Sequence, residues 1–160
     1  MTPPVLVLAI GNPSRGDDAL GPAFAQHLES TFAKEIAEGR LEVLTDFQLN
    51  VEHALDLLGR RQVLFVDADA RGAAPLAFTP VTARADPSFT SHALSPSAVL
   101  EAFTRVEARP PPPAFQLAIR GERFELGEGL TPQAAAALGQ ARRFFDDWWK
   151  GVEGMARHEA

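Results

Sequence analysis

The sequence predicts an α/β protein in three layers: a mostly parallel, twisted central sheet of about five strands with helices on both faces. Two observations support this prediction. Short, continuous apolar runs end at a glycine or an aspartate, which is typical of strands that are buried on both faces. Segments with a helical repeat of apolar residues lie between these runs. Ligands of such sheets bind beyond the carboxyl ends of the strands, so that edge is where we expect a functional site.

The first part of the chain predicts a strand, a loop, a helix and a second strand. Residues 5–10 (VLVLAI) form the first strand, and residues 41–44 form the second. Between them a helix begins near Pro22, because proline suits a first helical turn, and it stops at Gly39. The apolar face of this helix consists of residues spaced by a helical turn: Leu20, Phe24, Leu28, Phe32 and Ile36.

The middle of the chain predicts a capped helix and two further strands. Residues 51–59 form the helix, and Asn50 is its N-cap. Residues 63–66 are a buried apolar run and predict a third strand. Residues 76–81 contain Pro80, which cannot donate to a neighbouring strand, so they predict an edge strand. We expect the loops that follow residues 5–10, 63–66 and 76–81 to lie together at one edge of the sheet.

The last part of the chain repeats the helix-start signal twice. Ser95 before Pro96 predicts the start of one helix, and Thr131 before Pro132 predicts the start of a long final helix. Between them, the four prolines at 110–113 form a stiff connector that leads into a strand over residues 115–119. The connector therefore lies inside one domain.

Length and composition predict one soluble domain. A chain of 160 residues suits a single core, and we assign residues 1–150 to it and residues 151–160 to a polar tail that frays. The net charge is −6 and the 15 Lys and Arg residues are scattered, so nucleic acid and anionic membranes are poor partners. No apolar run is long enough to span a membrane. No cysteine is present, which excludes disulfides and thiolate nucleophiles.

The loop after the first strand, GNPSRGDDALG, is glycine-rich and acidic. Its glycines at 11, 16 and 21 fit neither the dinucleotide fingerprint nor the P-loop, and the P-loop lysine is missing. Asp17 and Asp18 stand where a helix N-terminus would stabilise carboxylates and where they would repel a phosphate. The loop therefore suits a cation better than a phosphate. A plain helix cap is the alternative explanation for an aspartate pair at this position.

Two further side chains, together with the acidic loop, make up a candidate metal site. Asp67 directly follows a buried strand, and His92 lies in a polar loop before a helix. With Asp18 they form a set of two carboxylates and one imidazole, which leaves a coordination position open as catalytic metal sites do. Such ligands suit zinc, nickel, iron or manganese. The other histidines, at positions 27, 53 and 158, are best explained as surface residues.

Four segments resemble the hydrogenase maturation proteases, which remove a C-terminal extension from the large subunit of nickel-iron hydrogenases. These segments are GNPSRGDDALG, VDA at 66–68, SHALSP at 91–96 and GEGLTP at 127–132, in the family's order. The resemblance implies that Asp18, Asp67 and His92 contact nickel held by the substrate, and that they are the catalytic residues. Ala19, where many members have glycine, and DFQLNVEHA, in place of a glycine-rich turn, depart from the family pattern.

The resemblance also sets expectations for the substrate and the setting. The partner would be a hydrogenase large-subunit precursor, the cofactor a transient, substrate-borne nickel, and cadmium or zinc would serve as its surrogates. The substrate would contact the loop residues Gly11, Asn12, Gly16 and Asp17, and Asp17 is a candidate proton acceptor. We expect a cytoplasmic monomer that binds neither nucleic acid nor membrane.

Two other functions stay open at this point. One is a metal-independent aspartic-type peptidase in which Asp18 and Asp67 share a proton. The other is a flavodoxin-like module that binds a nucleotide or flavin, although the aspartates oppose a phosphate. No G-x-S-x-G motif is present, so the sequence offers no serine mechanism.

Overall fold

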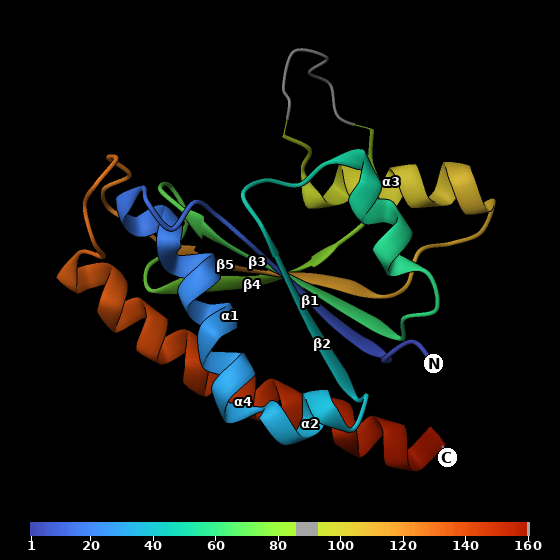
Figure 1. The fold of residues 1–160 in the computed structure, drawn as a ribbon. Helices are drawn as coiled ribbons and strands as arrows, with labels where there is room; N and C mark the ends of the chain where they lie inside the picture. The colour runs from blue at the N-terminus through green and yellow to red at the C-terminus, as the bar shows by residue number, and fades with distance from the viewer. Residues whose placement is uncertain (86–92, 160) are drawn as a thin grey trace.

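The computed structural model describes residues 1–85 and 93–159. Within them the chain forms a five-stranded sheet in the order β2-β1-β3-β5-β4, flanked by helices on both faces, so the predicted α/β class is confirmed (Figure 1). The elements in chain order are β1 (Val5–Ile10), η1 (Gly16–Ala19), α1 (Leu20–Thr31), α2 (Ala33–Ala37), β2 (Leu41–Asp46), η2 (Val51–Leu57), β3 (Gln62–Asp69), β4 (Leu76–Val81), α3 (Pro96–Glu107), β5 (Ala114–Arg120) and α4 (Pro132–Glu159).

Four strands of the sheet are parallel, and one edge strand runs the other way. β1 pairs with β2 and β3, and β3 pairs with β5, all in parallel, whereas β4 is antiparallel to β5. The edge position of β4 was predicted from Pro80. We expected the loop after β4 to lie with the loops after β1 and β3, and this expectation was wrong. Val81 pairs with Ala114, at the start of β5, so the loop after β4 begins at the amino ends of the parallel strands. The chain returns by Leu94, whose backbone N–H donates to the Leu49 carbonyl at 3.0 Å.

Alternation along β1 divides the apolar core between the two faces of the sheet. Val5, Val7 and Ala9 pack with α1 and α4, whereas Leu6 and Leu8 pack with η2 and α3. Every one of these side chains is buried because both faces of β1 are covered by helices, as Figure 1 shows. This double cover explains why the strand reads as a continuous apolar run.

The first predicted helix is divided in two, and the second has a tighter winding than expected. α1 ends at Thr31, Phe32 adopts a non-helical conformation, and α2 follows directly. η2 is a 3-10 helix whose N-cap is Asn50, as predicted: its side chain accepts a hydrogen bond from the Glu52 N–H at 3.0 Å. Ser95 likewise caps α3, accepting from the Ala98 N–H at 3.1 Å.

Residues 151–159 continue the last helix, where a frayed tail was expected. α4 extends through Glu159. Val152 packs against the core, and Glu153 accepts hydrogen bonds from Trp149 Nε1 and Arg40 Nη1, each at 2.6 Å. These contacts hold the C-terminal part of α4 against the start of β2. Within the described residues, no helix combines the length and apolar character needed to cross a lipid bilayer.

Candidate active site

The acidic loop folds as one 3-10 turn, η1, held tightly against its surroundings by glycines. Gly16 has a φ of +53°, and a Cβ there would lie 2.5 Å from the Arg123 carbonyl oxygen. Gly11 has a φ of +151°, and a Cβ there would lie 2.0 Å from the Asp18 carbonyl oxygen. Both positions therefore exclude a side chain, because backbone occupies the space. The glycines bring backbone segments together and do not form a phosphate cradle.

Asp17 is buried against the loop that follows β5, and it is not among the residues that line the cavity described below. Its exposed fraction is 0%, and its carboxylate accepts hydrogen bonds from the backbone N–H groups of Glu122, Arg123 and Thr131 and from the Thr131 hydroxyl, at 2.7–3.1 Å. Burial alone would raise the pKa of Asp17, but the hydrogen bonds from Thr131, Glu122 and Arg123 outweigh it and lower the pKa. A carboxylate with four donors and a lowered pKa suits a structural role, and it is poorly placed to accept a proton.

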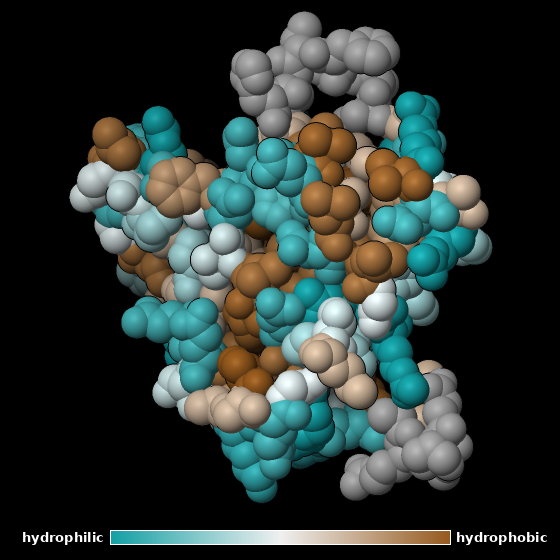
Figure 2. Space-filling view, turned by 45° about the vertical axis from the view of Figure 1, so that its right-hand side comes forward, coloured by the Kyte–Doolittle hydropathy of each residue, from teal (hydrophilic) through white to brown (hydrophobic). Residues whose placement is uncertain are grey.

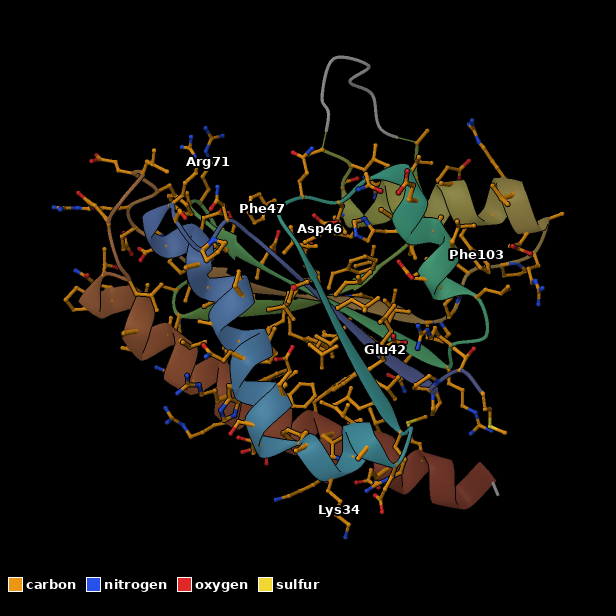
Figure 3. The ribbon with its side chains drawn as sticks, viewed as in Figure 1. Lys34, Glu42, Asp46, Phe47, Arg71 and Phe103 are labelled. Carbon is orange, nitrogen blue, oxygen red and sulfur yellow. The ribbon has the colours of Figure 1, made fainter. Side chains whose placement is uncertain are left out.

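Asp18 and Asp67 line the same cavity. The cavity has a volume of about 400 Å³ and lies at the carboxyl ends of β1 and β3. Asp18 is held by the Asn12 backbone N–H, which donates to its Oδ2 at 2.7 Å. The walls come from the end of β1, the loop after β2, the end of β3 and the start of α3: Ile10, Phe47, Gln48, Leu49, Phe65, Val66, Ala68, Ala93, Leu94, Ser95 and Pro96. Figure 3 shows Asp46 and Phe47 at this end of β2.

Among the candidate residues that the structure describes, Asp67 has the most perturbed environment. Burial, together with the nearby carboxylates of Asp69 and Asp18, raises its pKa to about 6, although a hydrogen bond from Gln116 opposes the rise. Gln116 Nε2 donates to both carboxylate oxygens, at 3.1 and 3.3 Å. Two partly buried carboxylates at one cavity are suited to bind a cation, because a cation would remove the cost of ionising Asp67.

The third predicted ligand, His92, lies outside the described residues. Its neighbour in the sequence, Ala93, lines the cavity with Asp18 and Asp67. Over residues 1–85 and 93–159, no group of three or more His, Asp or Glu side chains is arranged to hold a metal ion. Of the three predicted ligands, the structure thus brings the two carboxylates to one cavity and leaves the imidazole as a prediction.

His53 is a residue whose position the sequence did not indicate. We expected it at the surface, but only 7% of it is exposed. Its Nδ1 accepts from the Asn50 backbone N–H at 2.9 Å, and its Nε2 lies 3.3 Å from Asp46 Oδ2. The side chain therefore joins the N-terminus of η2 to the end of β2, directly before the cavity residue Phe47. The sequence did carry one signal for this contact: His53 is the third helical residue after the N-cap Asn50, the position from which a side chain can bond back to the N-cap backbone.

Four large apolar side chains are exposed on the loop after β2 and along and just after η2, and they are called the apolar strip here. It consists of Phe47, Val51, Leu55 and Leu58, which are 64%, 60%, 67% and 42% exposed. Phe47 belongs to both the strip and the cavity wall. Figure 2, in which the side carrying η2 and α3 is turned forward, shows apolar side chains at this surface.

With this sheet order and helices on both faces, the chain has the fold of several solved hydrogenase maturation proteases. The hydrogenase maturating endopeptidase HybD from E. coli superposes with a TM-score of 0.69 and 22% identity, over 95% of this chain and 94% of that one. The [NiFe] hydrogenase maturation protease HycI from Thermococcus kodakarensis KOD1 gives 0.65 and 17%, over 89% and 90%.

A third structure, hydrogenase 2 maturation peptidase from a Thaumarchaeota archaeon, gives a TM-score of 0.64 and 18% identity, over 91% of this chain and 97% of that one. No protein-family model matches the sequence, and a search of curated proteins finds no match. The likeness is therefore one of fold, and it extends over nearly the whole chain.

Proposed function

We propose that this protein is an endopeptidase that removes the C-terminal extension of a nickel-iron hydrogenase large subunit after nickel insertion. The observation that supports this most is the meeting of Asp18 and Asp67 at one cavity, in the fold of HybD and HycI. Nickel held by the precursor is then the substrate group that Asp18, Asp67 and His92 contact. The reaction takes place in the cytoplasm on a monomeric enzyme.

The contribution of the chain is to position the substrate. Asp18, fixed by the Asn12 N–H, and Asp67, fixed by Gln116, present carboxylate oxygens to the ion, and His92 adds an imidazole nitrogen. Contact with the ion places the scissile peptide bond at the edge of the sheet, where fixed orientation lowers the barrier to attack by water. Asp17 does not take the proton in this mechanism, because its carboxylate is already saturated with donors.

A protein substrate suits the surface around the cavity. The strip of Phe47, Val51, Leu55 and Leu58 presents large apolar side chains that a small substrate would not cover. Contiguous exposed apolar patches mark sites of protein interaction. The strip would contact the folded part of the precursor while its C-terminal extension enters the cavity.

The test is cleavage of a nickel-loaded large-subunit precursor by purified enzyme. We expect Asp18→Ala, Asp67→Ala and His92→Ala to lower kcat/KM at least about 100-fold, because each removes a contact to the ion. Asp147→Ala, which removes an exposed carboxylate on α4, is the control and should cleave normally. If all three site variants keep full activity, the proposed function is wrong.

A second candidate, an aspartic-type peptidase, is favoured by one observation. The pKa of Asp67 is raised to about 6, by burial and by the neighbouring Asp69 and Asp18 carboxylates, so Asp67 can hold a proton at mildly acidic pH. Two carboxylates that share a proton are the hallmark of that mechanism. Cleavage of nickel-free precursor in the presence of a chelator would establish it, and failure of that cleavage would leave the nickel-dependent mechanism.

A further inference from the structure

Gln116 reaches the candidate site from β5, the strand next to Asp67. In the parallel pairing of β3 and β5, Gln116 lies beside Phe65, and Ala118 lies beside Asp67. Residues two apart on a strand share a face, so the Gln116 side chain lies on the same face of the sheet as the Asp67 carboxylate. Ala118, the register partner of Asp67, carries only a methyl group as its side chain. The resulting contact joins Gln116 Nε2 to Asp67 Oδ1 at 3.1 Å and to Oδ2 at 3.3 Å.

This contact fixes the plane of the Asp67 carboxylate. An ionised carboxylate offers about four lone-pair positions, and an amide nitrogen placed between its two oxygens occupies one side of the group. The remaining lone pairs are left for a ligand in the cavity that Asp67 lines with Asp18. A carboxylate free to rotate would lose conformational freedom whenever it bound an ion, and one held in advance loses less.

The neutral charge of the donor also matters. A lysine or arginine at position 116 would hold the carboxylate equally well, but it would cancel the negative charge that attracts a cation. The amide of Gln116 orients Asp67 and leaves the charges of Asp67 and Asp18 for the ion. This combination of orientation with retained charge is what a metal-ligating carboxylate needs from its neighbours.

We infer that Gln116 is a positioning residue that holds the Asp67 carboxylate for contact with the metal in the substrate. The inference rests on the proposed function. It assigns Gln116 no contact with the scissile bond. Its effect is therefore confined to the part of substrate binding that depends on nickel.

The experiment compares nickel-loaded and nickel-free precursor as ligands of one enzyme. The KM for the nickel-loaded precursor is measured from cleavage, and the nickel-free precursor is added as a competitive inhibitor to obtain its Ki. Gln116→Met keeps the length of the side chain without the donor, and Gln116→Lys keeps a donor but adds a charge. Gln133→Met, at an exposed position in the first turn of α4, is the matched control.

We expect Gln116→Met and Gln116→Lys to raise KM for the nickel-loaded precursor about 10- to 100-fold, the range typical for loss of an outer-shell partner of a metal ligand. The Ki of nickel-free precursor should stay unchanged, whereas a merely structural defect would raise KM and Ki together. Gln133→Met should match the wild type in both constants.

The possible failures are distinguishable. If the wild-type enzyme cleaves no precursor, or binds both forms equally, the proposed nickel recognition is wrong and the role of Gln116 falls with it. If the wild type prefers the nickel-loaded form and Gln116→Met keeps that preference, only the inference about Gln116 is overturned. If Gln116→Lys keeps the preference for the nickel-loaded precursor and Gln116→Met loses it, the hydrogen bond to Asp67 matters and the neutrality of the donor does not.

Discussion

Asp17 and Thr131 are joined by two hydrogen bonds across 114 positions of sequence. The Thr131 backbone N–H donates to Asp17 Oδ1 at 2.7 Å, and its hydroxyl donates to Oδ2 at 2.8 Å. The same hydroxyl oxygen accepts from the Ala134 N–H at 3.2 Å and so caps α4. The start of the longest helix is thereby fastened to the glycine loop that carries Asp18.

The Asp17 carboxylate should be important for stability. The substitution Asp17→Asn leaves buried N–H donors facing an amide, so we expect it to lower the free energy of unfolding by about 3 kcal/mol or more. Asp18→Asn, which keeps an acceptor for the Asn12 N–H, should cost about 1 kcal/mol or less. Urea unfolding of both variants measures the difference. Equal losses for the two would contradict the structural role of Asp17.

Gly16 should not tolerate a side chain. Its φ of +53° and the Arg123 carbonyl, 2.5 Å from the position of a Cβ, both disfavour alanine. We expect Gly16→Ala to lower the free energy of unfolding by about 2 kcal/mol or more. Gly129→Ala is the control, because a Cβ there meets nothing within 4 Å, and its effect should stay within about 0.5 kcal/mol. Thermal unfolding of the two variants side by side tests this.

The raised pKa of Asp67 predicts a pH dependence of stability. Burial and the neighbouring carboxylates raise this pKa from 3.8 to about 6, so between these values the native protein holds a proton that the unfolded chain has released. The Asp67 contribution to stability therefore falls as the pH rises through this window. Asp67→Asn lacks this loss, and its stability relative to the wild type should increase from pH 4 to pH 7. A constant difference across that range would show that burial does not perturb Asp67.

The apolar strip should contribute to substrate affinity and not to the chemical step. Leu55→Glu places a charge in the strip, and we expect KM for the precursor to rise about tenfold, equivalent to about 1.4 kcal/mol, with kcat unchanged. Val106→Glu is a matched control, because Val106 is 66% exposed on α3 and lies outside the strip. Steady-state kinetics on the precursor distinguish the two. A similar KM for both variants would mean that the strip does not meet the substrate.

Features set by local chemistry could be predicted from the sequence. The caps at Asn50, Ser95 and Thr131 depend on a side chain and a backbone N–H only two or three residues away, and all three are present. The meeting of Asp18 and Asp67 at one cavity could be predicted, because Asp67 lies near the carboxyl end of β3 and Asp18 in the loop after β1, and parallel strands end at a common edge.

Features set by packing between distant segments could not be predicted. The burial of Asp17 depends on Glu122, Arg123 and Thr131, which lie more than 100 positions away. His53 is buried where η2 meets the end of β2, in contact with Asp46, and an apolar repeat does not predict this contact. The direction of β4 is equally hidden, since an apolar run looks the same in either orientation.

The course of α4 bears on how binding can be measured. The helix begins beside the glycine loop and, at about 1.5 Å per residue, continues to the far edge of the sheet, where Arg40 contacts Glu153 (Figure 1). A sensor surface or an affinity resin attached at the C-terminal end of α4 would thus hold the protein from the side remote from the acidic cavity. The cavity would stay accessible to a large macromolecule in solution.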